Sequence, residues 1–120
     1  MATNYVQKGD VIAFTAGAAH SSGDVVVIGA LIGVALSDVA NGAEGQAQIS
    51  GVFELPKATA AVIGAGESLT WDSSAGNFDD NAATPATGDV TGAAAVAIEA
   101  AGNGATTVKV RLTGVPGTVN

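Results

Sequence analysis

Apolar residues in this chain occur in short runs that are separated by turn-forming residues. Three of these runs, Val25–Ile28, Leu31–Leu36 and Val52–Leu55, are bounded by Gly, Asp, Asn or Pro. Such punctuated runs are typical of short β-strands joined by tight turns, and no helix of ordinary length fits between the breaks. The first two runs are almost continuously apolar around Gly29, which indicates two strands, or one bent strand, buried on both faces.

Several further segments have the composition of strands. Gly92–Ala100 is rich in alanine, the best helix former, and could be taken for a helix. However, the sequence GNG at Gly102–Gly104 is a hairpin signal, and a hairpin needs a strand on both sides. In Thr106–Thr113, after the GNG, apolar residues alternate with Lys, Arg and Thr. We therefore predict additional strands at Val11–Thr15, Gln46–Ser50 (before a bulge at Gly51), Ser68–Asp72, Asn77–Asp79, Gly92–Ala100 and Thr106–Thr113.

The remaining segments have weaker patterns. Lys57–Ile63 fits either one helical turn or an edge strand, and Asp80–Asp89 is expected to be a loop. Residues 1–9 are expected to form an extended arm, and residues 114–120 a loosely held tail. The sequence as a whole predicts an all-β fold, a single compact β-barrel or β-sandwich of about eight short strands, in one domain that spans residues 1–120.

The apolar residues are small, which limits the core that they can form. Apolar residues make up 48% of the chain, but they are mostly Ala and Val, with three Phe, one Trp and one Tyr. Small side chains each bury little area, and a small domain buries a smaller share of its surface than a large one. No cysteine is present to form a disulfide. Burial against other subunits or a larger partner is the simplest further source of stability, and a monomer with well-formed turns is the alternative.

The charge of the chain excludes two classes of partner. Eleven acidic residues against four basic ones give a formal net charge of −7. Nucleic-acid binders need a basic face, and anionic membrane surfaces attract basic segments, so neither partner is expected. The first ten residues have no apolar stretch of the signal-peptide type, and no run approaches the length of a membrane helix.

Candidate catalytic and metal-binding residues are sparse. His20 is the single histidine and stands in a loop with Ser21, Ser22 and Asp24. A Ser-His-Asp site requires these groups to converge around an oxyanion hole, which neighbours along one loop rarely do, so a solvated histidine is expected. With no cysteine and one histidine, Cys/His metal sites are excluded, and Gly64–Ser68 lacks the lysine of a phosphate loop. No cofactor, small-molecule substrate or enzymatic activity is therefore expected.

The Asp72–Asn81 segment leaves one question about calcium open. It is rich in oxygen ligands, but its spacing differs from the EF-hand and it lacks the final bidentate Glu. Asx-rich turns use the same side chains to bond their own backbone.

The aromatic and basic residues divide into core and interface candidates. Phe53 and Trp71 are expected to anchor the core, while Phe78 is expected on a hairpin. The interface candidates are residues of the arm and one face of the last long strand, where basic groups would pair with partner carboxylates unless that face is merely solvated: Tyr5, Val6, Lys8, Lys109 and Arg111.

The order of several motifs resembles one phage family. These motifs are GDVI at Gly9–Ile12, VVIGALIGVA at Val26–Ala35, GVFELPK at Gly51–Lys57, WD at Trp71–Asp72 and VKVRL at Val108–Leu112. With nearly the whole chain involved, the sequence resembles the small phage capsid cement, or head decoration, proteins. No one of these motifs is catalytic or specific alone, and the match depends on their order and spacing.

The resemblance implies a structural function. Such a protein would bind the outer surface of a phage head, bridge subunits of the major capsid protein and stabilise the expanded shell, as a homotrimer made in the host cytoplasm. The alternative is a β-rich structural module of a phage tail, a fibre or a cell-surface layer. A carbohydrate-binding protein is a third possibility, but it would need more exposed aromatic residues than this chain has.

Overall fold

A computed structural model of the chain describes residues 9–120, and no residue in that range is helical. The expected arm lies almost wholly outside these residues. The all-β prediction is confirmed, but the described part of the chain has eleven strands rather than about eight. They are β1 (Val11–Thr15), β2 (Val25–Ile28), β3 (Leu31–Ala35), β4 (Glu44–Gln48), β5 (Ser50–Pro56), β6 (Thr70–Asp72), β7 (Asn77–Asp79), β8 (Val90–Thr91), β9 (Ala95–Ala97), β10 (Thr107–Thr113) and β11 (Thr118–Val119).

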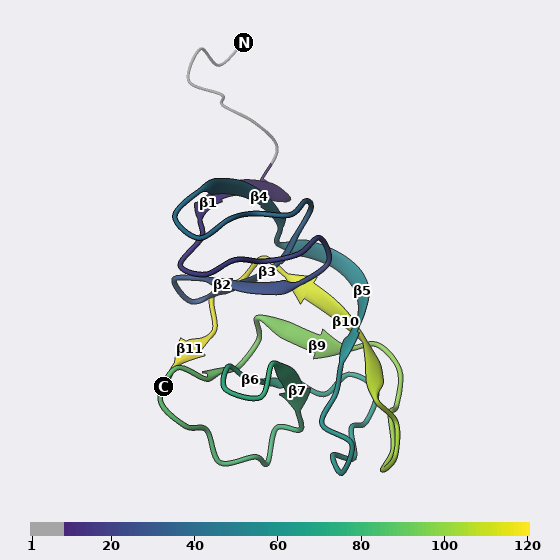
Figure 1. Cartoon of the computed structure of the whole chain (residues 1–120). Helices are drawn as coiled ribbons and strands as arrows, with labels where there is room; N and C mark the ends of the chain where they lie inside the picture. Colours follow the sequence, from purple (N-terminus) through teal and green to yellow (C-terminus); the bar gives the residue numbers. More distant parts are fainter. Residues whose placement is uncertain (1–8) are drawn as a thin grey trace.

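The first four strands form an antiparallel sheet in the order β1-β4-β3-β2, which we call the N-terminal sheet. Its β2–β3 hairpin closes through Gly29 and Ala30, with Ile28 opposite Leu31. Gly29 has φ +61°, a value that the first central residue of a tight type II′ turn requires and that glycine adopts without strain. The sheet curls over itself, with β1 and β4 above β2 and β3 (Figure 1).

Strands β5, β10 and β9 form a second sheet, which we call the β10 sheet. β5 begins only one residue after β4 and pairs with β10 along its full length, from Ser50 opposite Thr113 to Pro56 opposite Thr107. These two long strands run down one side of the molecule, from the N-terminal sheet to the strands at the other end (Figure 1). The predicted alternation in β10 is confirmed, because Val108, Val110 and Leu112 are buried while the residues between them are exposed.

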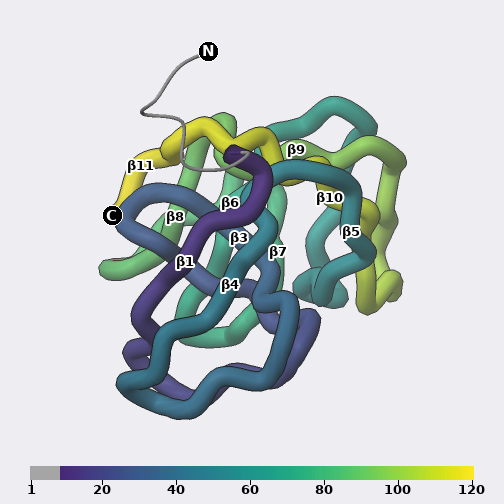
Figure 2. The backbone as a smooth tube through the Cα atoms, turned by 90° about the horizontal axis from the view of Figure 1, so that it is seen from above, coloured from purple at the N-terminus to yellow at the C-terminus, as the bar shows by residue number. Residues whose placement is uncertain are grey.

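The third sheet has the order β11-β8-β6-β7, and we call it the Trp71 sheet. The predicted hairpin around Ser73–Gly76 is present, and it places Trp71 opposite Phe78. Their ring centroids are 4.9 Å apart at an interplanar angle of 60°. Seen from above, β1 lies nearest the viewer, and β6 and β7 lie beneath the N-terminal sheet (Figure 2).

The core consists of two groups of buried apolar residues. The larger group lies among the β10 sheet, the Trp71 sheet and the inner side of β3, and Phe78 is its largest fully buried side chain. The smaller group fills the curl of the N-terminal sheet around Phe14 and Val26. Phe53 is only partly buried, so the prediction that it anchors the core is corrected: Phe78 takes that position beside Trp71.

In two interior segments the structure differs from the predicted form. In Gly92–Ala100 only Ala95–Ala97 is a strand; it pairs with β10, but nine residues separate the two strands instead of a tight GNG turn. Lys57–Ile63 is neither a helical turn nor a continuous strand, since isolated bridges at its two ends flank a turn.

The expected loose tail is instead held against the body. Thr118 and Val119 pair with β8, and Gly117 N–H donates to the Ala30 carbonyl at 2.8 Å. A Cβ on Gly117 would lie 2.5 Å from the Thr91 carbonyl oxygen, so the chain passes too close there for any other residue. The C-terminal segment therefore fastens the Trp71 sheet to the N-terminal sheet.

Candidate functional site

One face of the β10 sheet is open and carries two of the predicted interface residues. The other face packs on the core through Val108, Val110 and Leu112. Because side chains alternate along a strand and paired residues share a face, the register assigns the open side. We call it the outer face, and it is formed by Val52, Glu54, Val96, Ile98, Lys109 and Arg111.

The two basic residues of the outer face differ in their surroundings. Lys109 Nζ lies 3.5 Å from Glu99 Oε1, and both side chains are about half exposed. Arg111 is exposed and stands between Val52 on β5 and Val96 on β9. Within residues 9–120, its guanidinium has no hydrogen bond or ion pair. Arg111 is thus an unpaired positive charge between two valines, whereas Lys109 is paired with Glu99 of the same chain.

The interface candidates of the arm cannot be compared with the structure. Tyr5, Val6 and Lys8 fall outside the described residues. Their role stays a prediction.

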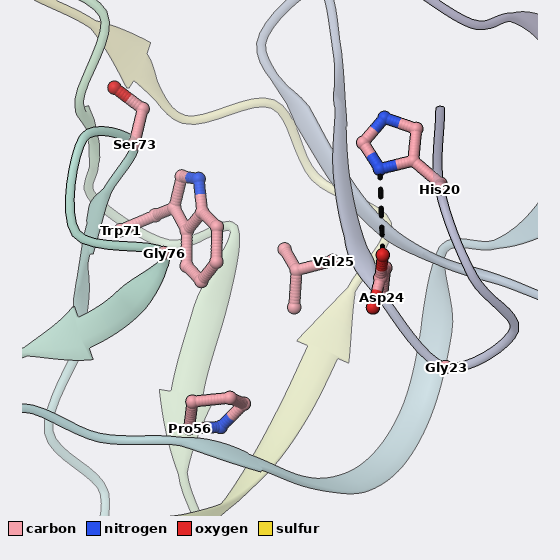
Figure 3. Close-up of a pocket in the computed structure, with 8 residues that line it drawn as sticks. All are labelled: His20, Gly23, Asp24, Val25, Pro56, Trp71, Ser73 and Gly76. Carbon is pink, nitrogen blue, oxygen red and sulfur yellow. Dashed lines mark ion pairs between the residues drawn. The ribbon is translucent and has the colours of Figure 1, made fainter. Parts of the chain in front are cut away.

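A cleft of about 360 Å³ lies between the N-terminal sheet and the Trp71 sheet (Figure 3). Its walls come from the loop before β2, the end of β5, and β6 with its turn; the residues that line it are His20, Gly23, Asp24, Val25, Pro56, Trp71, Ser73 and Gly76. His20 Nδ1 lies 3.8 Å from Asp24 Oδ2, and that oxygen also accepts a hydrogen bond from the Ser21 amide at 2.9 Å.

The cleft contains a serine, a histidine and an aspartate, but they do not form a catalytic triad. Figure 3 shows Ser73 on the opposite side of the cleft from His20, with its hydroxyl directed away. That hydroxyl donates to Asp89 at 3.2 Å. A nucleophile must lie within hydrogen-bond reach of its base, so the arrangement supplies no activated serine.

The Asp72 turn is built from hydrogen bonds within the chain. Asp72 Oδ1 accepts from the Ala75 amide at 3.0 Å, the Ser74 hydroxyl at 2.8 Å and the Ser74 amide at 3.1 Å. These bonds, first that from Ala75, lower the pKa of the Asp72 carboxyl below its ordinary value. Among residues 9–120, no three acidic or histidine side chains are grouped as metal ligands. Asp72 and Ser74, two of the side chains that raised the calcium question, thus form an Asx turn.

Two buried charged residues were not singled out from the sequence. Lys57 is 3% exposed, and its ammonium donates to the carbonyls of Ala58 at 2.7 Å, Ala105 at 3.3 Å and Thr59 at 3.4 Å. Asp89 is 4% exposed and accepts from Ser73 and Ala86. Both hold loops together. The burial of Lys57 could have been suspected from its position directly after Pro56, at the end of a strand. No local feature of the sequence indicates that Asp89 is buried.

No helix in the described part of the chain is long and apolar enough to cross a membrane.

These features define a class of protein: a small all-β protein with an open, mixed-charge sheet face and buried polar residues that serve the fold. Comparison with known protein families matches residues 6–112 to the phage cement protein family. The chain belongs to this family, and its role is to stabilise a phage capsid as a structural component of the virion, in association with capsid proteins. A search of curated protein sequences finds no significant match.

Proposed function

We propose that this cement protein binds the outer surface of the expanded head and bridges neighbouring subunits of the major capsid protein. It acts there as a single domain without enzymatic activity. Packaged DNA pushes capsid subunits apart, and a protein that buries surface across their seams stabilises the expanded shell by its preference for that state. Each contact can be weak, because contacts repeated within one oligomer reinforce one another.

The observation that carries this proposal is the setting of Arg111 on the outer face. Arginine is enriched at the centres of protein interfaces, where apolar neighbours exclude water from it. Arg111 has Val52 and Val96 on either side, and no acid in the described chain neutralises it. A carboxylate on the capsid surface would satisfy the guanidinium with two parallel hydrogen bonds. We therefore assign the outer face to the capsid contact.

We expect Arg111→Ala to weaken binding to expanded heads by about thirtyfold, which corresponds to about 2 kcal/mol for a hot-spot arginine. The measurement is co-sedimentation of the protein with heads over a range of concentrations. Lys109→Ala is the matched control, since it removes a positive charge from the same face and strand. Its effect should stay within about threefold, because Lys109 already pairs with Glu99. Equal losses for both variants would show that only overall charge matters, and no loss for Arg111→Ala would reject the outer face.

We further propose that the protein is a homotrimer, as the family resemblance implies. Light scattering at micromolar concentration should then give three times the chain mass of 11.5 kDa. The small Ala- and Val-rich core is the physical motive, because burial between subunits adds apolar contacts that one chain lacks. A mass of one chain both in solution and on heads would contradict this prediction.

A further inference from the structure

Trp71 is nearly buried yet lacks a partner for its polar group. The side chain is 7% exposed, and its rings pack on Phe78. Within residues 9–120 no group accepts a hydrogen bond from the indole N–H. The indole nitrogen is also absent from the fully enclosed atoms without partners, of which Asn77 Oδ1 is the one example in the described chain. The nitrogen therefore reaches solvent, and Trp71 is one of the residues that line the cleft.

The unpaired N–H indicates what an occupant of this cleft must supply. Buried tryptophan nitrogens usually find an acceptor, because an unsatisfied donor costs free energy. In Figure 3 the six-membered ring of Trp71 lies toward Val25 and Pro56, which makes that part of the cleft apolar. Across from the ring, Asp24 is about half exposed and carries the negative charge of the rim. An occupant thus needs a hydrogen-bond acceptor, an apolar side chain and a positive charge, close together.

The volume of the cleft sets the size of the occupant. At about 360 Å³, the cleft is at the lower end of the range for small ligand pockets. That is room for a few residues of extended chain and not for a folded element. An extended peptide also offers a backbone carbonyl at every residue, which suits the Trp71 N–H.

Residues 1–8 of this chain have the chemistry that the cleft requires. Their sequence, MATNYVQK, contains no acid, whereas the whole chain has a net charge of −7. Lys8 supplies a positive charge, and Tyr5 and Val6 supply apolar side chains. Charge complementarity with Asp24 therefore suits this segment. The other acid-free stretch that carries positive charges, around Lys109 and Arg111, is held in β10.

The position of β1 favours a neighbouring chain as the source of the segment. Figure 1 shows β1 on the far side of the β2–β3 hairpin from β6, which carries Trp71. A segment that precedes β1 would have to pass around its own N-terminal sheet to enter its own cleft. We propose that residues 1–8 of one copy dock in the Trp71 cleft of a second copy. This inference rests on the self-association proposed above and names its contact.

Trp71 is the single tryptophan of the chain, so its fluorescence reports directly on the cleft. In the full-length protein, the emission maximum should shift with protein concentration, in step with the mass measured by light scattering. Tyr5→Ala should raise the concentration at the midpoint of both curves by about tenfold. Asp24→Asn should raise it by about fivefold, and Glu44→Gln, which removes an exposed acid of the same sheet away from the cleft, should leave it unchanged. A synthetic peptide of residues 1–8 in excess should lower the mass while it preserves the shifted emission.

Three results would overturn the inference. If the mass rises with constant emission, the copies associate elsewhere, and the proposed trimer survives without this contact. If the emission is already shifted and does not depend on concentration, the segment occupies its own cleft. If the protein stays monomeric and the peptide does not change the emission, the cleft does not bind the segment. Head binding of Arg111→Ala is measured separately, so the failure of one proposal is distinguishable from the failure of the other.

Discussion

Replacing Phe78 with alanine is expected to lower the free energy of unfolding by about 3–5 kcal/mol. Phe78 is 0% exposed, and its ring packs on Trp71 at the centre of the larger core group. Its backbone carbonyl also accepts the Ala58 amide at 2.9 Å, so the space left by the ring lies where two segments meet. Small domains are stable by only about 5–15 kcal/mol, and this one change would remove a large share of that. Urea unfolding followed by circular dichroism measures the loss.

Phe53→Ala is the matched control for this prediction. It removes the same ring from a side chain that is only partly buried at the edge of the same core group. The loss should be about 1–2 kcal/mol, because less apolar area returns to water and the cavity is open to solvent. A Phe53→Ala loss as large as that of Phe78→Ala would contradict the assignment of Phe78 as the anchor of the core.

The second large effect is expected at Asp89, where alanine should cost about 2–4 kcal/mol. Asp89 Oδ1 accepts from the Ser73 amide at 3.1 Å and the Ser73 hydroxyl at 3.2 Å, and Oδ2 accepts from the Ala86 amide at 2.9 Å. The carboxylate is 4% exposed, so alanine would leave two backbone donors without partners in a place that water hardly reaches. The free energy of unfolding and the melting temperature measure the effect.

Asp89→Asn separates hydrogen bonding from simple loss of the side chain. Asparagine keeps the shape and one acceptor oxygen, so it should retain the Ser73 contacts and lose the bond to Ala86. We expect about half of the alanine effect. Equal destabilisation by both variants would mean that the negative charge, and not the set of acceptors, holds this junction together.

The strands of the fold could be predicted where apolar runs are long or alternate. Val11–Thr15 and Val25–Ile28 were predicted with their observed bounds, and the β10 alternation was predicted to within one residue. β8 and β11 were not predicted, because a strand of two residues has no periodicity to detect. They pair with each other across a sequence separation of 27, with Thr91 opposite Thr118.

The two phenylalanines show why a core is harder to predict than a strand. Phe53 lies in a strongly apolar run, which favoured it as the anchor, but its strand is at an edge of the β10 sheet. Phe78 lies in a polar, turn-rich segment, yet the hairpin places it opposite Trp71 in the core. Which residue is enclosed was decided by the pairing of the sheets, and one sequence does not contain that information in local form.

The candidate site was predicted in part. The common face of Lys109 and Arg111 followed from alternation along one strand. The different surroundings of these two residues could not be predicted. Glu99 reaches Lys109 from a segment beyond β9, while Val52 and Val96, the neighbours of Arg111, come from two other strands. The cleft was not predicted either. It brings together His20, which was expected in a solvated loop, and Trp71, which was expected in the core.

The attachment of the C-terminal segment also bears on the order in which the molecule is completed. Gly117 bonds to the β2–β3 turn, and the Asn120 amide and side chain both bond to the Asp89 carbonyl, at 2.8 and 3.1 Å. Every strand that this segment joins precedes it along the chain, and therefore leaves the ribosome earlier. The N-terminal sheet can pair its own strands during synthesis, but its fastening to the Trp71 sheet must wait for residues 117–120. The two sheets are thus fastened from the C-terminal side, by residues 117–120, after the strands that they join have been made.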